Sequence, residues 1–425
     1  MFSREDLFLV NPKTLSCLTL YLVSVILFVL LQTADANSCI NFNKDDRLIE
    51  VACVQADLPL VEQHLNKSDV IKRDPNDTKT WILNAGLLVH ENSIFYINSS
   101  TVDWLKVVPT KVTNENKTVV NNINNPNGIH VYGSLQIDSV KITSWDPLKR
   151  DVISFNLGKR PGEEHTKSDY DTSEPRVFIR VSKSATGTTN ITNSELAYMG
   201  YSCSRCSGLS YYGGLGSIIQ GNEIHHLLKG FYSNKMGFMT IDNNHIHDNY
   251  LYGIDPHTGT RDMVIQNNIV HHNNASGIIC SKNCQSILIE GNKVYQNNDG
   301  IAFSIETVNS TAKNNLVYDQ KRCISFSRYS NNNHVYNNSL LNCNTAVYIG
   351  DSSNNNISNN KIVNSESGII LTNTSNILRQ NELYDSKFGI VVLVPSNFTG
   401  DYNYNNRENI MHNVTKKIVF NTRES

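Results

Sequence analysis

The segment Tyr252–Asp262, "YGIDPHTGTRD", gathers several groups that can move protons or bind anions. A phenol, a carboxyl and an imidazole stand at Tyr252, Asp255 and His257, and a guanidinium follows at Arg261. The first three are common general acids and bases in enzymes, and a guanidinium binds carboxylates or phosphates. Whether these side chains form one functional site depends on whether the backbone turns them toward the same surface.

A repeat of 21 to 24 residues begins near Gly221 and includes this segment, so the repeat determines the backbone conformation around it. Residues at equivalent positions of successive copies form columns. One column is an Asn followed two positions later by an apolar residue. Another is a small residue, mostly Gly, followed directly by an aliphatic or aromatic residue. Each copy has two short β-type runs separated by Asn, Gly, Asp and Ser. The pattern predicts an all-β fold, a right-handed parallel β-helix with one coil per repeat. The Asn column runs through Asn222, Asn244, Asn268, Asn292, Asn315, Asn338, Asn360 and Asn381.

The predicted domain boundaries follow from where this pattern begins and ends. Residues 37–77 are predicted to form a small N-terminal cap, because an open solenoid end exposes strand edges. The β-helix is predicted over residues 78–410, and residues 411–425 are interpreted as a C-terminal tail.

The N-terminal segment indicates export. Residues 1–36 combine a basic start, the apolar run Leu15–Leu31 and the exit "ADA", Ala34–Ala36, as in a signal peptide. The apolar run is also nearly long enough for an uncleaved anchor, which would attach the protein to a membrane. Both interpretations predict a secreted or cell-surface location. N-x-S/T triplets such as Asn66 fit an exported glycoprotein.

The cysteines support the same location. One of the nine cysteines, Cys17, lies in the N-terminal segment, and an even number remains. In an exported chain this predicts disulfides. A zinc site built from Cys203, Cys206, Cys280 and Cys284 is the alternative. The plausible disulfide pairs are Cys39–Cys53, Cys203–Cys206, Cys280–Cys284 and Cys323–Cys343.

The charge balance of the chain indicates whether nucleic acid is an expected binding partner. The chain has 37 basic and 39 acidic residues, for a net charge of −2. A nucleic-acid binder normally shows a basic surplus or stripe, so nucleic acid is not an expected partner.

Alternation along the strands predicts which groups face solvent. Ile254 and Pro256 occupy the inward positions of their coil, so Asp255 and His257 are expected to point outward together. A second outward column carries His225, His247 and His271 on successive coils, flanking the coil of Asp255 and His257. We interpret the two groups as one functional groove.

Two alternatives stay open at this level. Asp-Pro-His followed by Thr-Gly-Thr is also an ordinary turn composition, in which Asp255 caps a backbone bend. The histidine column could be neutral imidazoles stacked for packing, or a metal site.

The stretch "YGIDPH", Tyr252–His257, resembles the signature Tyr-Gly-aliphatic-Asp-Pro-His of the mannuronan C5-epimerases, right-handed β-helix enzymes that invert C5 of uronate residues in alginate. "KITSWD", Lys141–Asp146, and "SELAYMGY", Ser194–Tyr201, are similar to stretches that precede this signature in the alginate-pathway members. The likeness covers residues 81–402.

The resemblance implies that a base removes the C5 proton and that an acid reprotonates the opposite face, while the substrate carboxylate is neutralised. It implies that His257 is the base and Tyr252 the acid, or the reverse, with Asp255 as orienter and carboxylate partner. His247 is the alternate base.

The remaining expectations concern the substrate. Arg261 and Lys282 are the nearest cations for an acidic sugar, and His225 and His271 are predicted to help bind it. The expected partner is an acidic polysaccharide; no cofactor is predicted, and calcium is left open. A polysaccharide lyase acting by β-elimination and a non-catalytic glycan-binding or cell-surface β-helix are the alternative functions.

Overall fold

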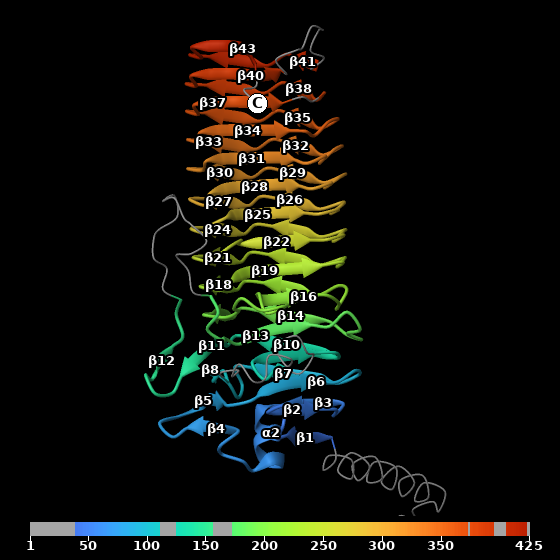
Figure 1. Ribbon diagram of the computed structural model, residues 1–425, viewed down its shortest axis with the longest axis vertical. Coiled ribbons are helices and arrows are strands. Elements are labelled where there is room, and N and C mark those ends of the chain that lie inside the picture. Colours follow the sequence, from blue (N-terminus) through green and yellow to red (C-terminus); the bar gives the residue numbers. More distant parts are fainter. Residues whose placement is uncertain (1–38, 111–124, 156–171, 373–374, 395–404, 423–425) are drawn as a thin grey trace, which may run out of the picture.

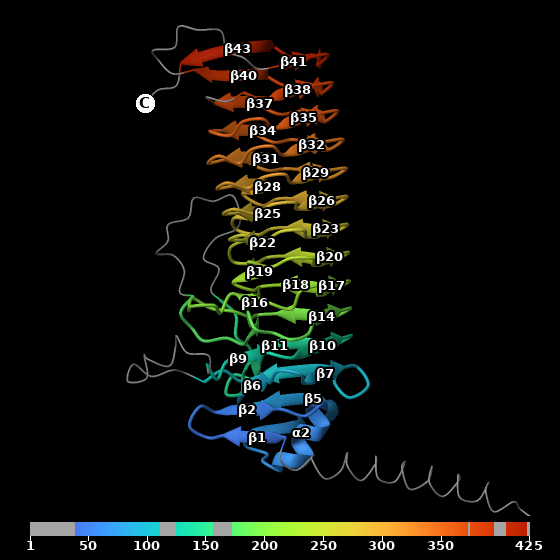
Figure 2. The same cartoon turned by 90° about the vertical axis from the view of Figure 1, so that its right-hand side faces the viewer.

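A computed structural model describes residues 39–110, 125–155, 172–372, 375–394 and 405–422 of the chain. The described coils stack into a long rod, with the N-terminal strands at one end and the C-terminal strands at the other (Figure 1, Figure 2). The predicted signal segment, residues 1–36, lies outside the described residues. Within the described ranges, no helix is long and apolar enough to cross a membrane.

Three sheets run along the rod, and each regular coil contributes one strand to each of them. The first, here called sheet 1, carries the strands that follow the small-residue column. Its 15 strands are, in spatial order, β1 (Ile40–Asn43), β2 (Leu48–Val51), β6 (Gly86–Val89), β9 (Gly128–Val131), β13 (Phe178–Val181), β16 (Gly208–Tyr211), β19 (Lys229–Asn234), β22 (Ile254–His257), β25 (Ser276–Ser281), β28 (Asp299–Ser304), β31 (Arg322–Ser327), β34 (Thr345–Gly350), β37 (Ser367–Thr372), β40 (Phe388–Val394) and β43 (Lys416–Thr422).

Sheet 2 precedes the Asn column in each coil. Its 13 strands are β3 (Gln55–Asp57), β7 (Ile94–Asn98), β10 (Ser134–Asp138), β14 (Thr189–Thr192), β17 (Ile218–Gln220), β20 (Thr240–Asp242), β23 (Val264–Gln266), β26 (Leu288–Glu290), β29 (Thr311–Lys313), β32 (His334–Tyr336), β35 (Asn356–Ser358), β38 (Ile377–Arg379) and β41 (Asn405–Arg407).

Sheet 3 follows the Asn column. Its strands are β4 (Ile71–Asp74), β5 (Asp77–Leu83), β8 (Trp104–Val107), β11 (Lys141–Asp146), β15 (Glu195–Ala197), β18 (Glu223–His225), β21 (His245–His247), β24 (Ile269–His271), β27 (Lys293–Tyr295), β30 (Leu316–Tyr318), β33 (Ser339–Leu341), β36 (Lys361–Val363), β39 (Glu382–Tyr384) and β42 (Ile410–His412), with β12 (Asp151–Val152) paired antiparallel to β11.

The predicted inward positions form the core. In the repeated coils, the aliphatic residue after the small residue and the residue two positions on are fully buried, as for Ile278 and Cys280 or Ile301 and Phe303, each 0% exposed. Pairing is parallel and in register, with Ile254 opposite Ile278 and Ile278 opposite Ile301. Equivalent residues therefore stack on one another along the rod, and the alternation predicted from the sequence is confirmed.

The Asn column forms a hydrogen-bonded ladder inside a corner. The side-chain amide of each member donates to the side-chain oxygen of the Asn one coil on, from Asn222 to Asn409, at 2.8–3.0 Å. The left-handed backbone belongs to the residue directly before, such as Asn243 (φ 53°), Asn267 (φ 56°) or Gly291 (φ 65°). The hydrogen-bonded ladder and the left-handed turn thus belong to two neighbouring positions of each coil.

The two ends of the rod differ. At the N-terminal end, helix α2 (Leu58–Leu65) and the antiparallel pairs β1–β2 and β4–β5 depart from the regular coil. At the other end, β42 and β43 extend sheets 3 and 1 to Thr422, through the segment assigned to a tail. The strands of the solenoid therefore continue beyond residue 410.

Disulfides join Cys39 to Cys53, Cys203 to Cys206 and Cys323 to Cys343, as predicted. The predicted Cys280–Cys284 pair is wrong: both are free, buried thiols. Cys280 points into the core from β25, and the Cys284 thiol lies 3.4 Å from the Pro256 carbonyl oxygen. The zinc site of four cysteines is also excluded, because Cys203 and Cys206 are bonded to each other. The three disulfides indicate an extracytoplasmic location.

Candidate functional site

The carboxyl group of Asp255 lies on the outer side of sheet 1, yet it is buried. Asp255 stands opposite Tyr232 of the neighbouring strand β19, and the flanking Ile254 and Pro256 face the core. Alternation correctly predicted its direction, but the predicted exposure to solvent is wrong, because only 1% of Asp255 is exposed. Side chains of adjacent columns cover it.

Lys229 is the main partner of this carboxylate. Its ammonium Nζ donates to Asp255 Oδ2 at 2.9 Å, and its side chain is 16% exposed. The same Nζ lies 4.3 Å from the ring centre of Tyr232 and 5.4 Å from that of Tyr252. A lysine enclosed by two aromatic rings and a carboxylate is held in place by cation–π and ionic attraction together.

Sequence reasoning missed Lys229, although a signal was present. Lys229 occupies the position directly before the small residue. The same position holds Tyr252 in the next coil and, in later coils, Asp299 and Arg322, which form an ion pair with each other. A column in which charged and aromatic residues precede the glycines indicates an outward functional edge.

Burial changes the acid–base properties of the pair Asp255 and Tyr252. Burial raises the pKa of Asp255, and the charge of Lys229 opposes that shift. Burial also raises the pKa of Tyr252, with a further contribution from the Asp255 charge. Within the described part of the chain, Asp255 Oδ1 accepts no hydrogen bond. Because this oxygen is also buried, the carboxylate lacks part of the hydrogen bonding that a buried charge needs.

His257 completes what we call the sheet 1 cluster: Lys229, Tyr232, Tyr252, Asp255 and His257. Its ring lies 5.5 Å from that of Tyr232, and its Nδ1 is 2.5 Å from the hydroxyl of Thr258. Burial lowers the pKa of His257, so the neutral imidazole is favoured. When Nδ1 donates to Thr258, the lone pair of Nε2 is available for a proton.

The two predicted cations occupy different places. Lys282 is exposed directly after β25, and its charge contributes to the lowered pKa of His257, so it belongs to the surroundings of the cluster. Arg261 lies beyond the end of β22, where its guanidinium pairs with Asp262 at 2.8 Å and lies 5.2 Å from the ring centre of Phe238. Its partners are therefore outside the sheet 1 cluster.

The predicted histidine column exists, but on another sheet. His225, His247 and His271 stack along sheet 3 with ring centres 5.0 and 5.1 Å apart and planes within 10° of parallel. Burial is the main cause that lowers the pKa of His271 to about 4. The column is outward, as predicted.

The prediction of one groove needs correction. Residues 248–253 separate His247 from β22 within the coil, and no hydrogen bond, ion pair or ring contact joins the column to the sheet 1 cluster in the described ranges. His247 instead contacts Asp248 and Glu223, at 2.7 and 3.3 Å. A corner of the coil thus divides the predicted site residues into two groups.

The stacked coils and parallel sheets define the class of the protein: it is a β-helix. Residues 179–340 match the family described as "Right handed beta helix region", in agreement with the predicted handedness and fold. No curated protein matches the sequence.

Solved structures of other proteins have a fold similar to that of this chain. The chain is similar to the periplasmic alginate epimerase AlgG, with 19% identity, a TM-score of 0.69, and coverage of 86% of this chain and 84% of that one. It is less similar to the A-module of the Azotobacter vinelandii mannuronan C-5 epimerase AlgE6, with 12% identity, a TM-score of 0.47, and coverage of 81% of this chain and 89% of that one. At such identities the likeness establishes the fold alone.

Proposed function

We propose that the protein is an extracytoplasmic enzyme that inverts C5 of uronate residues in an acidic polysaccharide. The observation that carries the proposal is the sheet 1 cluster, in which a neutral imidazole, a protonated phenol and a buried ion pair share one surface. Epimerisation needs a base, an acid and a cation for the substrate carboxylate, and these groups supply all three.

The protonation states support the assignment of base and acid. The lowered pKa of His257 keeps its imidazole neutral near pH 7, as a base must be. The raised pKa of Tyr252 keeps its phenol protonated, as an acid must be. We therefore assign proton removal to His257 and reprotonation to Tyr252.

Lys229 and Asp255 are proposed to bind the reacting sugar. Removal of the C5 proton places negative charge on the carboxylate, and an ammonium beside that carboxylate lowers the cost. Asp255 holds the Lys229 ammonium 2.9 Å from its own Oδ2 and so orients it.

The comparisons support the substrate class. The chain shares its fold with a protein named as an alginate epimerase, and the sequence signature Tyr252–His257 falls on the cluster. The disulfides fit a location where polysaccharides are exported or assembled.

The test is incubation of the full chain with polymannuronate in D₂O, followed by NMR of the polymer. We expect deuterium at C5 and guluronate without unsaturated chain ends. His257→Gln should reduce incorporation by about 10²- to 10⁴-fold, the usual contribution of a general base. The control His334→Gln changes an exposed histidine of sheet 2 and should leave the rate unchanged.

Other outcomes contradict the proposal. Unsaturated chain ends would identify a lyase, which removes the same proton but expels the C4 substituent. Binding of the polymer without deuterium uptake, for every polyuronate tried, would identify a non-catalytic glycan-binding solenoid.

A further inference from the structure

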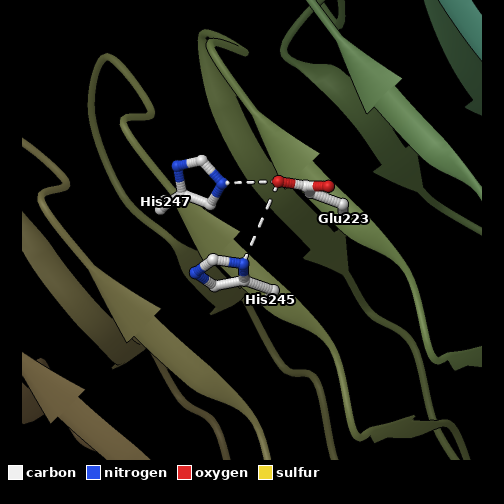
Figure 3. Close-up of side chains that lie close together, drawn as sticks. All are labelled: Glu223, His245 and His247. Atoms are coloured by element: carbon white, nitrogen blue, oxygen red, sulfur yellow. Dashed lines mark hydrogen bonds and ion pairs between the residues drawn. The ribbon is translucent and has the colours of Figure 1, made fainter.

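A second group of polar side chains lies on sheet 3, apart from the sheet 1 cluster. Glu223 of β18 and His245 and His247 of β21 bring three potential ligand atoms within 4.8 Å of one another (Figure 3). Glu223 Oε1 lies 3.3 Å from His247 Nε2 and 4.0 Å from His245 Nδ1. In a tetrahedral zinc site, with Zn–N bonds of about 2.0 Å, ligand atoms lie about 3.3 Å apart. Small rotations of the more exposed Glu223 and His245 side chains would therefore close the site.

The backbone explains why these groups converge. His245 and His247 are two positions apart on one strand, so both point outward while Ile246 between them enters the core. Glu223 stands directly opposite His245 in the parallel register of β18 and β21. Two adjacent coils thus present a carboxylate and two imidazoles to the same point.

The outer nitrogens of both imidazoles are already held. His247 Nδ1 lies 2.7 Å from Asp248 Oδ2, and His245 Nε2 lies 2.7 Å from His271 Nε2. Metal-binding histidines usually donate their second ring N–H to such an acceptor, which fixes the tautomer and the ring orientation. Both contacts leave the nitrogen that faces Glu223 as the one free to bind a metal ion.

We propose that Glu223, His245 and His247 form a Zn²⁺ site with an open fourth position. Imidazole nitrogen suits Zn²⁺, whereas Ca²⁺ and Mg²⁺ are bound almost entirely by oxygen. Three protein ligands are the usual number in zinc sites that keep a position for water or another ligand. The exposed fractions of His245 and Glu223, 42% and 52%, leave that position accessible.

The site would also join neighbouring coils. Its ligands come from two successive coils, and His271, the partner of His245, comes from a third. A bound ion would therefore stabilise this part of the rod in addition to offering a coordination position. The proposal does not depend on the epimerase activity, because its ligands and those of the sheet 1 cluster are different residues.

The test is titration of the full, untagged chain with Zn²⁺ by calorimetry after removal of bound metal with a chelator. We expect one saturable site per chain. Glu223→Gln and His247→Gln should each weaken binding by at least about tenfold, and Asp248→Asn by about tenfold through loss of its hydrogen bond. His334→Gln, on sheet 2, should bind like the unchanged chain.

Absorption of the Co²⁺-substituted chain gives a second measurement, since tetrahedral Co²⁺ has intense visible bands that depend on the ligands. These bands should appear with the unchanged chain and be lost in His247→Gln. If that variant does not fold by circular dichroism, His245→Gln replaces it. The proposal is overturned if Zn²⁺ does not saturate a site, or if binding persists undiminished in the Glu223 and His247 variants.

Discussion

Replacement of Lys229 by Met tests the ion pair at the centre of the sheet 1 cluster. Met keeps the apolar length of the side chain between the two tyrosines but removes the ammonium. At 2.9 Å and an effective dielectric constant of about 20, the lost attraction to Asp255 is about 6 kcal/mol before desolvation is considered. Because Asp255 stays buried and is left without its partner, we expect a net loss of about 3 to 5 kcal/mol in the free energy of unfolding at neutral pH.

The loss should depend on pH in one direction. Lys229 opposes the rise of the Asp255 pKa, so its removal raises that pKa further above the unfolded value of about 3.9. The folded state then holds a proton that the unfolded state releases, and its stability falls as pH rises through this range. The variant should therefore be close to the unchanged chain at pH 4 and show its full deficit at pH 7.5.

Urea unfolding followed by far-UV circular dichroism at both pH values measures this difference. Lys361→Met, an exposed lysine of sheet 3, serves as the control and should change stability by less than about 0.5 kcal/mol. Adding Asp255→Asn to Lys229→Met should recover most of the loss at pH 7.5. A deficit of equal size at pH 4 and pH 7.5, or no recovery in the double variant, would refute the reasoning.

Three further predictions concern other parts of the molecule. Since burial lowers the pKa of His257, the rate of deuterium uptake by the polymer should decrease as pH falls, with a midpoint below the value of about 6.5 of a free imidazole; a midpoint above about 6.5 would contradict this. Asn292→Ala removes an interior step of the ladder and should lower the free energy of unfolding in urea by about 3 kcal/mol, whereas Asn344→Ala, which is exposed, should change it by less than about 0.5 kcal/mol. Without reductant, iodoacetamide should label Cys280 and Cys284 only after denaturation, as measured by peptide mass spectrometry; labelling of the folded chain would contradict their burial.

The solenoid could be predicted because the same packing contacts recur in each of its coils. The ladder residue Asn268 needs a neighbour one period away to bond its amide, and Ile278 needs an apolar residue above and below it. Such requirements recur at fixed spacing, so they are visible in a single sequence. The inward positions and the Asn corner follow directly from them.

Contacts between columns could not be predicted in this way. Alternation gives the direction of Asp255 but not the long side chain from the neighbouring coil that covers it, and so its burial was missed together with Lys229. The spacing of Cys280 and Cys284 permitted a disulfide, but both side chains are buried and remain unbonded. The histidine column and the sheet 1 cluster appeared as one group because the sequence does not show how the corner at residues 248–253 divides them.

The regular backbone also limits where chemistry can arise. Since successive coils have nearly the same register, a coil can differ from its neighbours only through the side chains at its outward positions and corners. Where the coils beyond β22 carry Ile279 and Ala302 on the outer side of sheet 1, β22 carries a buried carboxylate. Burying Asp255 beside a lysine lowers stability relative to an apolar residue at that position. A packing role alone would be served better by Ile or Ala, so the cost at this one coil favours a binding or catalytic role for the sheet 1 cluster.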